Sequence, residues 1–151
     1  MAIDPGYDRM GVAIMEHETV LFSDCLGSNA ALEFPERLGE LGAQVKKLIA
    51  KWRPNVLATE NLFFEKNQKT AMRVAEVRGM LLYIASEAGL EVREYTPMEV
   101  KVAVAGYGKA DKRQVMSMVP RLAKLAHVPK RDDEYDAIAI GLTCVARRLS
   151  P

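Results

Sequence analysis

The sequence predicts an α/β domain in which helices flank a central mixed sheet. Three short strand-like segments open the chain before any helix, which favours antiparallel pairing among them. Helical and strand-like segments then alternate, as in sheets that gain later strands through right-handed helical crossovers. With 151 residues and neither a repeat nor a linker-like stretch, the chain is expected to form one domain over residues 1–151.

The first three strands are predicted from short apolar runs. Residues 1–3 are an apolar start that Asp-Pro-Gly at residues 4–6 interrupts. Residues 11–15 and 20–25 are joined by a polar turn, which is a hairpin pattern. These three strands should be antiparallel.

Helices and strands alternate in the next part of the chain. A helix is expected over residues 35–52, because a proline opens it and its apolar residues recur at helical spacing. Residues 56–59 form a short strand that stops at Glu60. A second helix is expected over residues 70–88, and residues 90–95 form a further strand.

Three helices are predicted for the remainder. Residues 96–99, Thr-Pro-Met-Glu, supply a cap, a first-turn proline and an acid three residues after the cap. A further helix is expected over residues 111–125, and the last begins at Asp132 or Asp133.

Composition excludes several classes of protein. Hydrophobic residues make up 49% and charged residues 27% of the chain, which is normal for a folded domain and excludes a disordered one. No apolar run reaches the roughly 18 residues that a membrane-spanning helix needs. Asp4 argues against a secretion signal, and Cys25 and Cys144 match neither a metal spacing nor a disulfide framework. We therefore expect a reduced, cytoplasmic protein with no membrane partner.

The net charge of +1 hides an uneven distribution. Residues 101–131 carry eight basic residues and one acid, a net charge of +7, which leaves −6 for the rest of the chain. The basic residues are Lys101, Lys109, Lys112, Arg113, Arg121, Lys124, Lys130 and Arg131. A basic block beside an acidic remainder is typical of a nucleic-acid-binding face next to a carboxylate cluster. On the charges alone, a solvated amphipathic helix is an equally good interpretation.

Four carboxylates have no evident structural task. Asp4 and Glu60 each stand at the carboxyl end of an apolar strand, where ligands collect in α/β sheets. Asp133 and Asp136 are three residues apart at a helix start, so their side chains point to the same side. The structural alternatives are a turn residue for Asp4, an N-cap for Asp133 and a first-turn acid for Asp136.

Metal-assisted hydrolysis of a phosphodiester explains all four acids together. If they converge, their mutual repulsion in a low-dielectric cleft has to be offset. Mg²⁺ prefers carboxylate oxygen ligands, and two such ions about 4 Å apart are common in enzymes that act on phosphodiesters.

Several segments of the chain form a recognisable set. They are Ala2-Ile3-Asp4-Pro5-Gly6, Glu60-Asn61-Leu62-Phe63-Phe64 with Lys66-Asn67, Arg78-Gly79, Tyr95-Thr96-Pro97, Val100-Lys101, Gly106-Tyr107-Gly108, Lys112, Gln114-Val115 and Asp133-Glu134-Tyr135-Asp136-Ala137. Together they resemble the RuvC-type Holliday junction resolvases. The similarity runs from Ala2 to about Thr143, with the motifs in the family's order and spacing.

The resemblance implies an RNase H-like fold and a homodimeric, Mg²⁺-dependent endonuclease. Such an enzyme resolves four-way (Holliday) DNA junctions by paired symmetric nicks in recombination and repair. Four positions match the family's metal-binding catalytic tetrad: Asp4, Glu60, Asp133 and Asp136. Two Mg²⁺ ions per active site are expected, with Mn²⁺ as a substitute. Phe63 matches an aromatic that stacks on bases near the crossover, and Lys101 and Lys112 match basic residues near the scissile phosphates.

The residues themselves support and extend this set of DNA contacts. Phe63 follows the Glu60 strand directly, where an aromatic side chain suits stacking on unpaired bases, with core packing as the alternative. Lys112 and Arg113 lie at a helix start, where backbone N–H groups also favour phosphate. Lys66 and Lys109 complete the predicted DNA-binding residues, although a solvated face explains Lys66 equally well.

The chain departs from the family pattern in two places. Only three residues precede Asp4, so either the first strand is unusually short or its start lies outside this sequence. Asp133 stands where some members have histidine. Three rival functions are an RNA-directed nuclease of the YqgF type, a sugar-kinase-like ATPase and a catalytically silent junction-binding module. The Phe63 loop and the segment from Gly-Tyr-Gly to Lys112 count against the first, the short chain against the second and the complete set of carboxylates against the third.

A homodimer is expected because the four-way junction has two equivalent strands to cut. The interface is expected on the helix over residues 70–88, where Met72, Met80 and Leu82 lie off the main apolar stripe. Burial of these three side chains against the last helix is the alternative. Branch-migration proteins are a further candidate partner.

Overall fold

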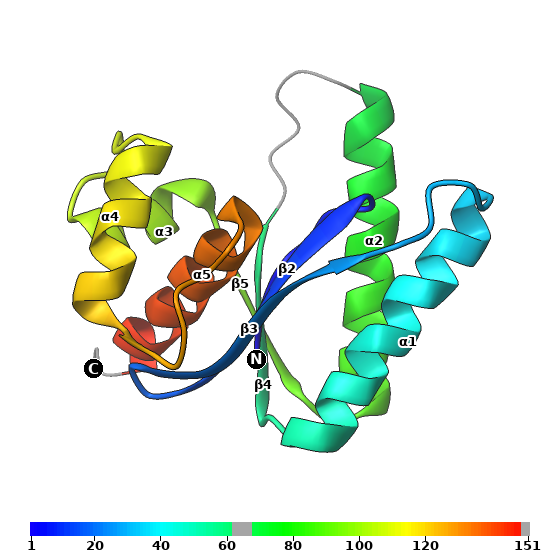
Figure 1. Cartoon of the computed structure of the whole chain (residues 1–151), viewed down its shortest axis with the longest axis horizontal. Coiled ribbons are helices and arrows are strands. Elements are labelled where there is room, and N and C mark those ends of the chain that lie inside the picture. Colours follow the sequence, from blue (N-terminus) through cyan, green and yellow to red (C-terminus); the bar gives the residue numbers. More distant parts are fainter. Residues whose placement is uncertain (62–67, 149–151) are drawn as a thin grey trace.

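The computed structural model describes residues 1–61 and 68–148 and forms one six-stranded sheet with helices on both faces (Figure 1). The strands lie in the order β5-β4-β1-β2-β3-β6. Their bounds are Ala2–Asp4 (β1), Arg9–Glu16 (β2), Thr19–Gly27 (β3), Val56–Glu60 (β4), Glu91–Tyr95 (β5) and Lys124–Leu125 (β6). The helices are Phe34–Trp52 (α1), Gln68–Glu87 (α2), Pro97–Ala105 (α3), Lys112–Leu122 (α4) and Asp132–Arg148 (α5).

The strand directions confirm the predicted mixed sheet. β1, β2 and β3 pair antiparallel, while β4 and β5 add to the β1 edge in parallel. A helix joins β3 to β4 and another precedes β5, which is the crossover arrangement that parallel neighbours require. The first strand is three residues long in the given sequence.

The predicted helix over residues 111–125 is wrong at its end. α4 stops at Leu122, and Lys124–Leu125 instead pairs in parallel with the start of β3. Pro120 lies in the last turn and has no N–H for the helical ladder, and Ala123 already has extended backbone angles. The chain therefore leaves the helix early, and a sixth strand extends the sheet.

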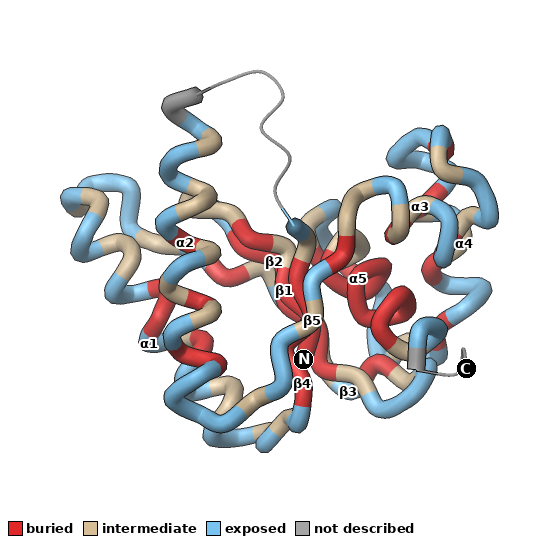
Figure 2. Tube along the Cα trace, turned by 180° about the vertical axis from the view of Figure 1, so that it is seen from behind, coloured by how far each residue is buried: buried red, intermediate tan, exposed pale blue. Residues whose placement is uncertain are grey.

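The sheet separates two hydrophobic clusters, because alternate residues of a strand point to opposite faces. Ala2 and Ala58 pack with α5 on one face, whereas Ile3 and Leu57 pack with α1 and α2 on the other. The middle of α5 is buried at every position from Ala137 to Cys144, since α3 and α4 cover it on the side away from the sheet. Figure 2 shows this band of buried residues along the central strands and α5.

Two glycines allow α5 to approach the sheet closely. A Cβ atom at Gly141 would overlap Sδ of Met15 and lie 3.3 Å from Cβ of Ala2. A Cβ atom at Gly11 would overlap the backbone carbonyl oxygen of Asp133. The start of α5 therefore rests directly on β2, at the residue that pairs with Asp4 of β1.

α2 lies on the face of the sheet opposite to α5 (Figure 1). The alternative in which Met72, Met80 and Leu82 pack against the last helix is therefore wrong. Met80 packs towards Gly42 of α1, whereas Met72 is 66% exposed. Within the described ranges, no helix is long and apolar enough to cross a membrane.

Candidate active site

β1 and β4 place the first two acids side by side. Their parallel register pairs Ala2 with Ala58 and Ile3 with Thr59, so the next residues, Asp4 and Glu60, are neighbours at the carboxyl end of both strands. Because side chains alternate, both acids project to the same face as Ala2 and Ala58, the face that α5 covers.

α5 places the other two acids over that same corner of the sheet. Asp133 lies in its first turn and Asp136 follows three residues later. Acidic side chains are favoured at a helix N-terminus by the helix dipole. The close contact of the Asp133 carbonyl with Gly11 brings this turn down beside Asp4, the strand partner of Gly11. The structure therefore brings all four predicted acids together.

The electrostatics show that the four acids act on one another. Burial, followed by the charges of Asp136, Glu60 and Asp133, raises the pKa of Asp4 to about 7. Burial and then the charge of Asp136 also raise the pKa of Glu60 above its ordinary value. Burial raises the pKa of Asp136 in the same direction, against the opposing effect of Lys112. The site holds more negative charge than its surroundings balance.

Cationic side chains from the basic block line the same site. Nζ of Lys112 lies 2.9 Å from Oδ2 of Asp136 and 3.5 Å from Oδ2 of Asp132. Although burial alone would lower it, this pairing raises the pKa of Lys112. Lys101 is close enough to Glu60 to oppose the rise of its pKa. The basic segment thus lies next to the acids in space, as the charge pattern indicated.

Two residues at the site were not predicted. Nε of Arg9 lies 3.7 Å from Oδ2 of Asp133, and the Cys25 thiol donates to the same oxygen at 3.6 Å. Burial, followed by the charge of Asp133, raises the pKa of that thiol. The hairpin register could have indicated that Cys25 lies near the site, because Cys25 pairs with Gly11, the residue beneath the start of α5. Arg9 had no comparable signal.

The donor set fits a hard divalent cation. Four carboxylates supply oxygen ligands. The pKa of Asp4 is raised by burial and then by the charges of the other three acids, and a cation would offset those charges. As the side chains lie here, no three His, Cys, Asp or Glu groups in residues 1–61 and 68–148 are arranged to hold an ion. One oxygen of Asp136 is instead bonded to Lys112. The residues fit the ion by chemistry and charge, and their side chains have to adjust to coordinate it.

The other predicted DNA contacts differ in how the structure places them. Lys109 and Arg113 are exposed on the segment that includes the start of α4, close along the chain to Lys112. Phe63 and Lys66 lie outside the described residues. Tyr107 of the Gly-Tyr-Gly motif is 58% exposed and so is not a core residue.

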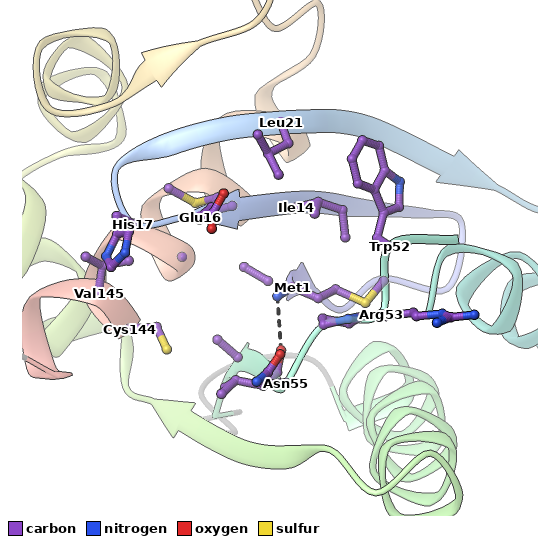
Figure 3. A pocket seen from close by; sticks show the side chains of 16 residues that line it. Met1, Ile14, Glu16, His17, Leu21, Trp52, Arg53, Asn55, Cys144 and Val145 are labelled. Carbon is purple, nitrogen blue, oxygen red and sulfur yellow. Dashed lines mark hydrogen bonds between the residues drawn. The ribbon is translucent and has the colours of Figure 1, made fainter. Parts of the chain in front are cut away.

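Two cavities among the described residues lie away from these acids. A cavity of about 500 Å³ lies at the opposite end of β1 and β4, between Ile14, Trp52 and Cys144 (Figure 3). There the N-terminal ammonium of Met1 donates to the carbonyl of Val56 at 3.0 Å. A second cavity, of about 480 Å³, lies between the loop after β1 and the starts of α1 and α2. The half-buried acids stand instead at the carboxyl end of β1 and β4, beside the start of α5.

The mixed sheet carries one acid at the end of each of two adjacent parallel strands. A helix packed across these strands adds two more acids. This arrangement defines an RNase H-like nuclease. The family model described as "Crossover junction endodeoxyribonuclease RuvC" matches residues 1–144. The chain belongs to this RuvC family of endodeoxyribonucleases. The resemblance found in the sequence and the fold it implied are both confirmed.

Named relatives agree along nearly the whole chain. The RuvC protein of Ruminiclostridium cellulolyticum is 40% identical over 146 residues, which cover 94% of this chain and 88% of the relative. That of Chloroflexus aurantiacus is 42% identical, with 94% and 89% covered. Among solved structures, "T. thermophilus RuvC in complex with Holliday junction substrate" superposes with a TM-score of 0.86 at 33% identity. That match covers 98% of this chain and 93% of the other.

Proposed function

We propose that this protein resolves four-way DNA junctions by paired symmetric nicks, in homologous recombination and DNA repair. The observation that carries the proposal is the convergence of Asp4, Glu60, Asp133 and Asp136 at one corner of the sheet. The superposition on a RuvC protein solved with a Holliday junction supports four-way DNA as the substrate. A junction-binding module without catalysis has no need of four mutually repelling acids.

The same four acids would hold two Mg²⁺ ions, for which Mn²⁺ should substitute. When bound, such ions polarise the scissile phosphate and lower the pKa of an attacking water. Asp4 holds a proton near neutral pH because its pKa is about 7, so it can release that proton as positive charge gathers at the site.

The basic residues next to the acids would position the DNA backbone. Lys112 and Lys101 lie beside the acids and supply positive charge where a phosphate would approach. Lys109 and Arg113 would extend this contact along the segment at the start of α4, and Lys66 and Phe63 are proposed to contact the crossover. Phosphate contacts of this kind position DNA without reading its sequence. The cytoplasm is the expected location, and branch-migration proteins remain candidate partners.

The direct test is cleavage of a synthetic four-way junction beside a linear duplex of the same sequence. Mg²⁺ and Mn²⁺ should support paired nicks in the junction, whereas Ca²⁺ should support binding alone, since its looser coordination misplaces the attacking water. Undiminished cutting in excess EDTA would contradict the metal mechanism. Junction binding without cutting in any of these ions would instead identify a silent binding module.

Lys112→Ala is expected to weaken both junction binding and cutting, with a shallower dependence of binding on salt. Removal of one phosphate contact should lower the salt slope by about one. Lys47→Ala is the matched control, because Lys47 is exposed on α1, on the other face of the sheet. Binding titrations from about 50 to 200 mM salt measure the slope. If the salt dependence of binding is unchanged in Lys112→Ala, Lys112 does not contact a phosphate and serves only its ion pair with Asp136.

We also propose an isologous homodimer, because one chain carries one set of acids and the junction presents two equivalent strands. The exposed side of α2 remains the proposed interface: Met72 is 66% and Tyr83 62% exposed. Sedimentation at micromolar concentration is expected to give about twice the chain mass of 16.8 kDa. A monomer that persists with junction DNA bound would contradict the dimer.

A further inference from the structure

The first turn of α5 carries a buried acid that the proposed chemistry does not use. Glu134 lies between Asp133 and Asp136 in the sequence, and only 3% of its surface is exposed. It does not contribute to the raised pKa of Asp4, unlike the two acids beside it. A buried carboxylate is costly unless its oxygens are hydrogen-bonded, so its partners indicate its role.

Both oxygens of Glu134 are bonded to other parts of the chain. Oε2 accepts from Oγ of Ser23 at 2.7 Å, and Nε2 of His127 lies 3.5 Å from it. The same His127 nitrogen lies 3.1 Å from Oγ of Ser23, which closes a triangle of polar groups. Oε1 accepts from the backbone N–H of Lys130 at 2.9 Å and of Arg131 at 3.3 Å. Although burial alone would raise it, these bonds lower the pKa of Glu134.

These bonds join three segments that are distant in sequence. Ser23 belongs to β3, His127 to the loop after β6, and Glu134 to the third position of α5. A glutamate there commonly bonds back to the N–H before the helix, as it does here to Arg131. In this chain, a serine from the sheet adds the bond that ties the helix start to β3.

The same turn has a second contact with the sheet. The Asp133 carbonyl lies against Gly11 of β2, the strand partner of Asp4. The start of α5 is thus held at two points of the β2–β3 hairpin, one directly beside Asp4. Since Asp133 and Asp136 belong to this turn and the next, their distance from Asp4 and Glu60 depends on these two contacts.

We propose that Glu134, held by Ser23 and His127, is a positioning residue that fixes Asp133 and Asp136 relative to Asp4 and Glu60. It thereby sets the affinity of the four acids for divalent cations, and it does so without touching the cation or the DNA. The inference rests on the proposed function, because it assumes that these acids bind a cation. Outer partners of this kind commonly change metal affinity by 10- to 100-fold.

The test measures Mn²⁺ binding to the DNA-free protein by electron paramagnetic resonance. Glu134→Ala should weaken Mn²⁺ binding about tenfold or more, and Ser23→Ala about threefold or more. Glu134→Gln should stay within about threefold of the original protein, since its amide oxygen can accept the two backbone N–H bonds and its amide N–H can donate to Ser23. The matched control is Glu16→Ala, an exposed acid at the far end of the same hairpin, which should change nothing.

Two results with folded Glu134 variants, and one with Ser23→Ala, would overturn the proposal. Mn²⁺ affinity of Glu134→Ala close to that of the original protein would show that the buried acid does not position the cluster. Equal weakening by Glu134→Gln and Glu134→Ala would show that its charge, not its hydrogen bonds, is what matters. If near-ultraviolet circular dichroism shows that Glu134→Ala is misfolded, Ser23→Ala decides, and unchanged affinity in that variant overturns the proposal.

Junction cutting by the unaltered protein is measured separately. A protein that binds Mn²⁺ but cuts no junction contradicts the proposed function, while the Mn²⁺ titrations alone decide the role of Glu134. The two failures are therefore distinguishable.

Discussion

Replacing any one of the four clustered acids by its amide is expected to lower junction cutting by about 100- to 1,000-fold or more, with the fold intact. The variants are Asp4→Asn, Glu60→Gln, Asp133→Asn and Asp136→Asn. Each removes the charge of one proposed oxygen ligand with almost no change of side-chain volume, so the packing between α5 and the sheet is kept. Single-turnover cleavage at saturating Mg²⁺, together with binding in EDTA, separates lost chemistry from lost affinity.

Asp132→Asn is the matched control for these four variants. Asp132 lies in the same turn of α5, but its side chain is 65% exposed and is paired only with Lys112 in the described residues. Its amide variant should cut within a few-fold of the original protein. Junction binding by the four test variants should be retained or tightened, because each loses a negative charge near phosphate. Near-normal cutting by any of the four would remove that residue from the tetrad.

Asp4→Asn is expected to raise the free energy of unfolding by about 2–4 kcal/mol at pH 8 in the absence of divalent cations. The pKa of Asp4 is about 7 in the folded chain and 3.8 in its unperturbed state, so the folded state holds the proton more tightly. Its ionisation therefore costs stability as the pH rises through 7, and this cost is absent below about pH 4. The amide carries no such charge.

Urea unfolding of both proteins at pH 8 and pH 4 measures this effect. The advantage of Asp4→Asn should be largest at pH 8 and nearly absent at pH 4. Saturating Mg²⁺ should reverse the order at pH 8, since the cation stabilises only the protein with all four carboxylates. If Asp4→Asn is less stable than the original protein at pH 8 without metal, the Asp4 carboxylate stabilises the fold and its ionisation does not cost stability.

Much of the active site was predictable because it depends on short-range signals. Asp4 and Glu60 end apolar runs, and the pair Asp133 and Asp136 opens the last helix. Parallel pairing of β1 with β4 then follows from the helical crossover between them. Those rules place Asp4 and Glu60 side by side at one corner of the sheet. The approach of Asp133 and Asp136 to that corner depends on a long-range contact, that of the Asp133 carbonyl with Gly11.

What the sequence did not predict depends on contacts between distant residues. Ser23 and Glu134 are 111 positions apart, and neither lies in a pattern that marks a functional pair. Lys112 was predicted as a phosphate contact, and only the structure shows that it also pairs with Asp136. β6 has two residues and ends a segment whose spacing is helical, so its pairing with β3 carried no local signal.

The most direct measurement of the central claim is the anomalous diffraction of Mn²⁺ in crystals of this protein. The claim is that Asp4, Glu60, Asp133 and Asp136 together bind the divalent cations that drive junction cutting. We predict anomalous density between these four side chains, with manganese about 2.0–2.3 Å from their oxygens and Lys112 displaced from Asp136. Manganese bound elsewhere at saturating concentration, with none among the four acids, would contradict the account.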